Sequence, residues 1–332
     1  MDERKANMIR SILPFILIIT VSCSGIIDRR ATPEPGQKSL KPPVLPKVSG
    51  DINLTFVGTL GDNISIKSPW GISFGIDGTL YICDRDNSGI IRLDSNGNVI
   101  SRFSGFDSRT ERLFLPIDVS VSGGIEIYAL DSANSRVLRF DRNLKNAYEI
   151  YEPDIDEKGL FGTFSGLAFD KISGDIFITD RDNGTVIRID MLGGNIHTTG
   201  EFGSEKLSLR KPAGLEVADD DTIFIADREY GAVAILPHFG AELTYIGKDI
   251  LEAPVDVAVL PGNLIAVADK SGVLILNRTG IPQAFAGFGT DREMTPRSVA
   301  IFEGKLFVSD ALSNSILVYR IENSFQNSSL GD

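Results

Sequence analysis

The chain has 332 residues, a formal net charge of −12 and two cysteines. Sequence-independent binding of nucleic acid needs a basic surface that displaces counterions, so this acidic balance argues against that class of function. We expect neither cysteine to form half of a disulfide, and the length allows one large domain without help from metal or disulfides.

The N-terminal segment has the pattern of an export signal. Three basic residues within the first ten precede an apolar run over 12–21, as in secretory signal peptides. Thr20-Val21-Ser22-Cys23 resembles the lipobox of bacterial lipoproteins, in which cleavage precedes a cysteine that is then lipidated; Thr20 stands where that family usually has Leu. We predict a signal peptide over 1–22 and lipidation at Cys23. The alternative is an uncleaved anchor over 11–27, which is slightly short for a membrane span.

The next segment, residues 23–50, begins with the predicted anchor cysteine and continues as a proline-rich tether. It has five prolines and few large apolar residues, a composition typical of an extended linker. Together these segments predict an exported protein of the bacterial cell envelope. It would be lipid-anchored at the membrane periphery, on the periplasmic side or the cell surface.

From residue 51 onward the chain repeats one pattern six times. The copy over 69–84 has a proline, a short apolar strand, the turn Asp77-Gly78, a second apolar strand and a closing aspartate. The closing aspartates of the six copies recur at intervals of 41 to 49 residues: Asp84, Asp131, Asp180, Asp227, Asp269 and Asp310. A period of this length is typical of the blades of a β-propeller.

Each complete copy of the repeat predicts four strands. The continuously apolar run Leu80–Cys83 fits a strand covered on both faces, and two further strands are expected at 90–93 and 98–103. The sixth copy lacks a fourth strand, because residues 322–332 form a polar tail. We predict an all-β fold: a six-bladed β-propeller over 51–321. The N-terminal strand, about 53–61, would complete the last blade and close the ring, which removes free sheet edges.

Two stretches carry a family resemblance: Pro212-Ala-Gly-Leu with Ile223-Phe-Ile-Ala-Asp227, and Asp131-Ser-Ala-Asn-Ser-Arg-Val137. They resemble the repeat units of NHL-repeat proteins, over about residues 51–321. The resemblance implies a six-bladed propeller. It implies no particular function, because the same fold hosts enzymes, sensors and scaffolds.

Candidate binding residues gather on one face. In a propeller, the loops that enter each first strand and those that follow each second strand emerge together, on what we call the top face. Arg85, Arg181 and Arg228 follow the closing aspartate in three blades and form a candidate binding rim. The alternative is that they form surface ion pairs. We expect the closing aspartates themselves to be structural and to accept backbone N–H bonds from their own loops.

Three carboxylates are predicted near the mouth of the central channel. Asp118 and Asp256 stand two residues after the first-strand proline in opposing blades, and Glu216 lies in a blade between them. Converging carboxylates can hold a hard cation such as Ca²⁺. The alternative is that each one caps the entry of its own strand.

Two hypotheses about function follow. The first is a non-enzymatic, lipid-anchored propeller that binds a protein, peptide or glycan through its top-face loops, as a monomer without a cofactor. The alternative is a cation-dependent, lactonase-like hydrolase or lyase that uses Asp118, Glu216 and Asp256 with Ca²⁺. The chain has only two histidines, and neither is expected near the channel mouth, which favours the first hypothesis.

Overall fold

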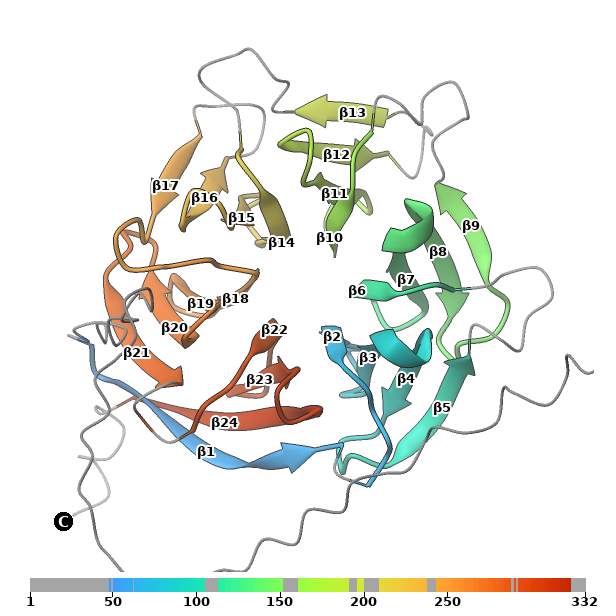
Figure 1. Cartoon of the computed structure of the whole chain (residues 1–332), viewed down its shortest axis with the longest axis horizontal. Helices are drawn as coiled ribbons and strands as arrows, with labels where there is room; N and C mark the ends of the chain where they lie inside the picture. Colours follow the sequence, from blue (N-terminus) through green and yellow to red (C-terminus); the bar gives the residue numbers. More distant parts are fainter. Residues whose placement is uncertain are drawn as a thin grey trace, which may run out of the picture. The chain divides into compact units, whose positions relative to one another are not determined.

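Six four-stranded antiparallel sheets follow one another around a ring and form a six-bladed β-propeller in the computed structural model (Figure 1). The structure describes residue 48 and residues 50–61, 63–104, 113–151, 161–190, 196–199, 209–237, 243–287, 290 and 292–323. The all-β class and the six blades predicted from the repeats are confirmed. None of the helices among the described residues is long and apolar enough to cross a membrane.

The blades follow the order of the repeats. Blades one to three contain β2 (Pro69–Phe74), β3 (Leu80–Asp84), β4 (Gly89–Leu93) and β5 (Val99–Ser104); β6 (Pro116–Ser122), β7 (Glu126–Asp131), β8 (Arg136–Asp141) and β9 (Tyr148–Tyr151); and β10 (Phe164–Phe169), β11 (Ile176–Asp180), β12 (Thr185–Ile189) and β13 (Ile196–Thr199). Blades four to six contain β14 (Pro212–Val217), β15 (Ile223–Asp227), β16 (Ala232–Leu236) and β17 (Thr244–Ile246); β18 (Asp256–Leu260), β19 (Leu264–Asp269), β20 (Gly272–Asn277) and β21 (Pro282–Gly287); and β22 (Pro296–Phe302), β23 (Lys305–Asp310), β24 (Ser315–Asn323) and β1 (Ile52–Leu60). The first strand of each repeat lies innermost (Figure 1).

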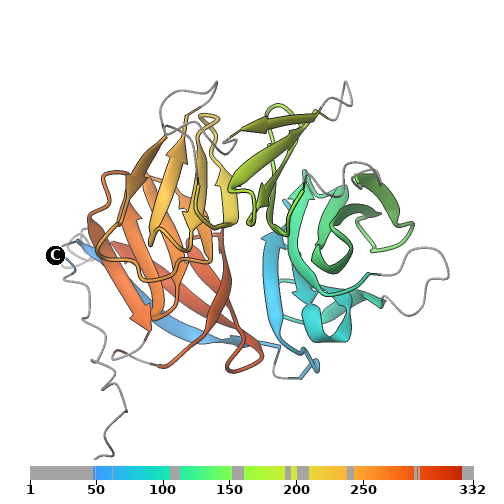
Figure 2. The same ribbon diagram turned by 45° about the horizontal axis from the view of Figure 1, so that its top comes forward.

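The N-terminal strand closes the ring, as predicted. β1 pairs antiparallel with β24, from Ile52 opposite Asn323 to Leu60 opposite Ile316. Both views show β1, in blue, running along the outer side of β24, in red (Figures 1 and 2). β24 continues two residues beyond the boundary expected for the polar tail, because Glu322 and Asn323 find pairing partners in β1.

The core is divided among the junctions between blades. Each of six buried apolar clusters joins residues of two neighbouring blades. In β3, Tyr81 and Cys83 pack toward blade two, whereas Leu80 and Ile82 pack toward blade six. This alternation explains why consecutive residues of the second strands are mostly apolar, since both faces of these strands are covered. Cys83 lies in this core as a free thiol.

The first strands share an irregularity at their top ends. The pairing register shifts near the entry of β2, β6, β10, β14 and β22. A bulge of this kind bends a strand and redirects its side chains. These register shifts lie at the top ends of the first strands, which are the innermost strands of the ring.

Candidate functional site

The closing aspartates tie the top face together. All six are buried, with exposed fractions of 0 to 2%. Each carboxylate accepts a backbone N–H bond from the loop that enters the first strand of its own blade: Lys67 to Asp84 at 2.8 Å, Phe114 to Asp131 at 3.0 Å, Gly162 to Asp180 at 2.7 Å, Arg210 to Asp227 at 2.8 Å, Ala253 to Asp269 at 2.7 Å and Thr295 to Asp310 at 2.6 Å. Burial raises the pKa of Asp84, Asp131 and Asp269, against the effect of these bonds. The closing aspartates therefore have a structural role, because their carboxylates accept hydrogen bonds that fix the entering loops.

A cavity of 270 Å³ lies where the inner strands converge, and we call it the mouth cavity. Side chains from all six blades line it. The residues of one set each stand one position after the residue that opens a repeat: Trp70, Ile117, Ser165, Ala213, Val255 and Arg297. A second set stands one residue further on: Gly71, Asp118, Gly214, Asp256 and Ser298. A third set follows the closing aspartates: Arg85, Ser132, Arg181 and Arg228. Lys211 and Thr163 complete the polar part of the wall.

Asp118 and Asp256 both line the mouth cavity, and both join one blade to the next. The Asp118 carboxylate accepts a bond of 2.8 Å from the Leu167 N–H of blade three and one of 2.9 Å from its neighbour Val119. The Asp256 carboxylate accepts a bond of 2.9 Å from the Val299 N–H of blade six. Each aspartate therefore does more than cap its own strand, because it fixes the spacing between two inner strands.

The glycines of the inner ring make room for these aspartates. A Cβ added at Gly71 would collide with Oδ1 and Cα of Asp118, and one added at Gly214 would collide with the Asp256 carboxylate. The alternation of glycine and aspartate around the channel is thus explained by packing and hydrogen bonding. It does not by itself require a ligand.

The two channel aspartates hold their protons more tightly than an ordinary carboxyl group. Burial raises the pKa of Asp118 well above its usual range, and the nearby charge of Asp256 raises it further. Burial also raises the pKa of Asp256, although hydrogen bonds from Ser298 and Val299 oppose the shift. Among the described residues, no group of three or more His, Cys, Asp or Glu side chains is arranged to hold a metal ion.

Glu216 does not join the other two carboxylates at the mouth cavity. It lines a separate cavity of 720 Å³, together with Lys171 and Glu303. Glu216 stands two residues beyond Gly214 in β14, which places it roughly 7 Å further along the strand. Burial raises the pKa of Glu216 to about 7; the charge of Lys171 opposes the shift and that of Asp256 adds to it. Glu216 thus lines a different cavity from Asp118 and Asp256, although its charge acts on Asp118 and the charge of Asp256 acts on it.

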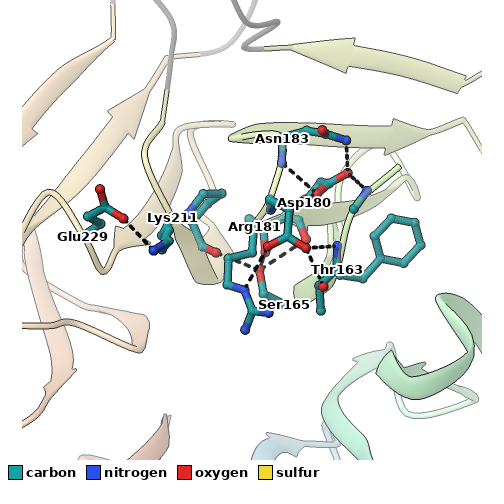
Figure 3. A network of polar contacts seen from close by, with 12 residues as sticks. Thr163, Ser165, Asp180, Arg181, Asn183, Lys211 and Glu229 are labelled. Atoms are coloured by element: carbon teal, nitrogen blue, oxygen red, sulfur yellow. Dashed lines mark hydrogen bonds and ion pairs between the residues drawn. The ribbon is translucent and has the colours of Figure 1, made fainter. Parts of the chain in front are cut away.

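The three candidate rim arginines all reach the mouth cavity. Arg85 pairs with Asp86 at 3.0 Å and lies over the Trp70 ring at 4.9 Å. Arg181 pairs with Asp182 at 3.5 Å, beside the bonds that Asp180 makes to its loop (Figure 3). Arg228 forms no ion pair within the described part of the chain. The alternative that these arginines form surface ion pairs therefore holds for Arg85 and Arg181 but not for Arg228.

Two further cations belong to the cavity wall and were missed from the sequence. Lys211 precedes the proline of blade four and pairs with Glu229 at 2.7 Å (Figure 3). Arg297 follows the proline of blade six and lies over the Trp70 ring at 5.0 Å. Aligning the repeats one residue after the proline would have singled out Arg297, because it is the one charged residue at that position in the six copies.

Some predicted features lie outside the described residues. These include the predicted signal peptide over 1–22, the predicted anchor Cys23 and one of the two histidines, His238. The other histidine, His197, lies within the fourth strand of blade three, opposite Arg188.

No family model matches the sequence, and no curated protein matches it. Solved structures share the fold. A gluconolactonase from Xanthomonas campestris is 14% identical, with a TM-score of 0.62 over 85% of this chain and 99% of that one. A streptogramin B lyase is 14% identical, with a TM-score of 0.58 over 82% and 88% of the two chains. A chain of a nidogen/laminin complex is 17% identical, with a TM-score of 0.53 over 68% and 88%. At these identities the likeness establishes the propeller fold alone.

We predict that Glu216 makes the protein less stable as pH rises. Its pKa of about 7 in the folded protein exceeds the ordinary value of 4.5, so between these pH values the folded protein binds more protons than the unfolded chain. The free energy of unfolding should therefore fall across this window, by at most ~3 kcal/mol. Glu216→Gln should remove this part of the decline in denaturant unfolding measured at several pH values. If the free energy of unfolding fell equally steeply with pH in Glu216→Gln and in the wild type, the raised pKa of Glu216 would be contradicted.

Proposed function

We propose that the chain is an exported, lipid-anchored binding protein that takes up a protein, peptide or glycan ligand at the mouth cavity of its top face. The observation that carries this proposal is the cavity itself, which receives side chains from all six blades. Concave sites that combine apolar surface with convergent polar groups are the usual places for ligands, and this cavity combines Trp70, Ile117 and Val255 with several charged side chains. A rigid ring holds the loops around it, which lowers the entropic cost of binding.

Binding is better supported than catalysis. The carboxylates that a hydrolase would need are bonded to backbone N–H groups, and Glu216 lies in another cavity. Fold neighbours include a gluconolactonase and a streptogramin B lyase, but also a chain from a protein complex, so the fold favours neither role. The cation-dependent hydrolase remains the alternative, and Ca²⁺ would have to bind at Asp118 and Asp256.

Export and anchoring are proposed from the sequence. The basic start, the apolar run over 12–21 and Cys23 after Ser22 form the signal. The first strand of the ring begins at Ile52, so residues 23–50 separate the anchor cysteine from the propeller. A single lipid chain binds membranes reversibly, whereas two or more anchor a protein stably.

Blocking the mouth cavity should abolish ligand binding. Ala213→Trp adds a large ring to the cavity wall, at the position where blade one carries Trp70, and leaves every charge in place. We would probe arrays of neutral and acidic glycans and peptides with the labelled full-length chain. We expect binding by the wild type and its loss in Ala213→Trp, with unchanged thermal unfolding.

Binding that survives in Ala213→Trp would remove the mouth cavity from the proposal. Turnover of a lactone in the presence of Ca²⁺, if Asp118→Asn abolished it, would instead establish the alternative. Both measurements use the same purified protein, so the two functions can be compared directly.

Anchoring is tested at Cys23. In a bacterial host that is fed a labelled fatty acid, we expect the wild type to be labelled and to enter the detergent phase. Cys23→Ser should lose both properties, because the serine cannot form the thioether that carries the lipid. Cys83→Ser is the matched control, since Cys83 is buried in the propeller core. Unchanged partitioning of Cys23→Ser would favour the uncleaved anchor.

A further inference from the structure

We propose that the ligand of the mouth cavity carries an oxyanion, a carboxylate or a phosphate, which binds between Arg228 and Arg297. This inference rests on the proposed function and narrows it, because it names the chemical group that the cavity selects. It depends on three observations: the cations of the wall, their own partners, and the size and composition of the cavity.

The wall of the mouth cavity concentrates positive charge in an acidic protein. Five cationic side chains line it, although the chain as a whole has a net charge of −12: Arg85, Arg181, Lys211, Arg228 and Arg297. They come from blades one, three, four and six, so the fold and not the local sequence brings them together. Low-dielectric walls lined with one sign of charge focus the field and attract ions of opposite sign.

Three of these cations already have carboxylate partners. Arg85, Arg181 and Lys211 pair with Asp86, Asp182 and Glu229, in that order. Arg228 and Arg297 pair with no carboxylate among the described residues. Two positive charges in the wall therefore form no ion pair within the described residues, although the charge of Asp310 acts on Arg297, and an oxyanion would supply a direct partner.

Arg297 is held in an unfavourable setting. It is partly buried, and its Nε is shielded from solvent and has no hydrogen-bond partner among the described residues. Burial lowers the pKa of Arg297, and the like charges of Arg228 and Arg85 lower it further. A desolvated guanidinium next to two others destabilises the folded protein unless an anion binds there. Groups perturbed in this way tend to mark functional sites.

The form of the cavity favours a small planar or tetrahedral anion. A guanidinium presents a fork of donors that matches carboxylate and phosphate oxygens. The cavity volume of 270 Å³ suits a group of about the size of one sugar residue, and Trp70, whose ring lies beside Arg85 and Arg297, adds apolar surface to the wall. An acidic sugar satisfies both requirements, since it has a flat apolar face and a charged substituent.

The acidic groups of the cavity do not oppose such a ligand strongly. Asp118 and Asp256 direct their oxygens to the N–H groups of Leu167, Val119 and Val299. Burial raises the pKa values of both groups, which opposes their ionisation compared with that of an exposed carboxylate. The cations of the wall outnumber them.

The test is calorimetric titration of the full-length chain with four probes: inorganic phosphate, glucose 6-phosphate, glucuronate and glucose. We expect glucuronate or glucose 6-phosphate to bind and neutral glucose not to bind. If only inorganic phosphate binds, the ligand is a free anion. If glucuronate or glucose 6-phosphate binds, the ligand is a sugar that carries an anionic group. Added NaCl should weaken binding, because the charges lie near the surface.

Variants locate the anion. Arg297→Gln and Arg228→Gln should each weaken binding roughly tenfold or more, as expected for the loss of a charge-assisted hydrogen bond. Arg297→Lys keeps the positive charge but lacks the forked pair of N–H donors, so its affinity should lie between that of the wild type and that of Arg297→Gln. Lys270→Gln is the matched control: Lys270 follows the closing aspartate of blade five, pairs with Glu252 and does not line the cavity. Arg228 is exposed, so its variant should fold even if Arg297→Gln does not.

The outcomes separate this inference from the proposed function. Binding of glucose as tight as that of glucuronate, or equal affinities for Arg228→Gln and Lys270→Gln, overturns the oxyanion. If Ala213→Trp still abolishes that binding, the mouth cavity stands as the ligand site. Binding that neither Ala213→Trp nor the arginine variants affect overturns both.

Discussion

The bond between a buried closing aspartate and the loop of its own blade is the interaction on which the top face depends. In each blade it connects the end of the second strand to the segment that enters the first strand. These aspartates are excluded from water, so losing the carboxylate would leave buried N–H donors unsatisfied, at a cost of about 1–3 kcal/mol for each. Because the bond fixes the aspartate, it also fixes the residue that follows, and in three blades that residue is an arginine of the mouth cavity.

A second set of constraints acts at the centre of the ring. Glycines of the inner strands leave space that Asp118 and Asp256 fill, and these two aspartates bond the next blade. The carboxylates are thereby used in holding the ring, whereas Arg228 and Arg297 form no ion pair within the described residues. This difference favours the binding of an anion over that of a cation.

The fold was predictable because it depends on local patterns that recur. The closing aspartates, the doubly covered second strands and the missing fourth strand of the last repeat together predicted six blades and closure by β1. The site was only partly predictable, because it depends on where separate strands converge. Arg85, Arg181 and Arg228 could be found from their place in the repeat. Arg297 stands out only when the repeats are aligned one residue after the proline, and Lys211 only once the cavity is known; the distance along β14 carries Glu216 into another cavity.

We propose that the mouth cavity binds an oxyanion between Arg228 and Arg297, and a crystal structure of the full-length chain grown with glucuronate tests this most directly. We expect a carboxylate group in the mouth cavity, within hydrogen-bond distance of both guanidinium groups and close to the Trp70 ring. A glucuronate bound elsewhere, or a cation held by Asp118 and Asp256 in the same cavity, would contradict it.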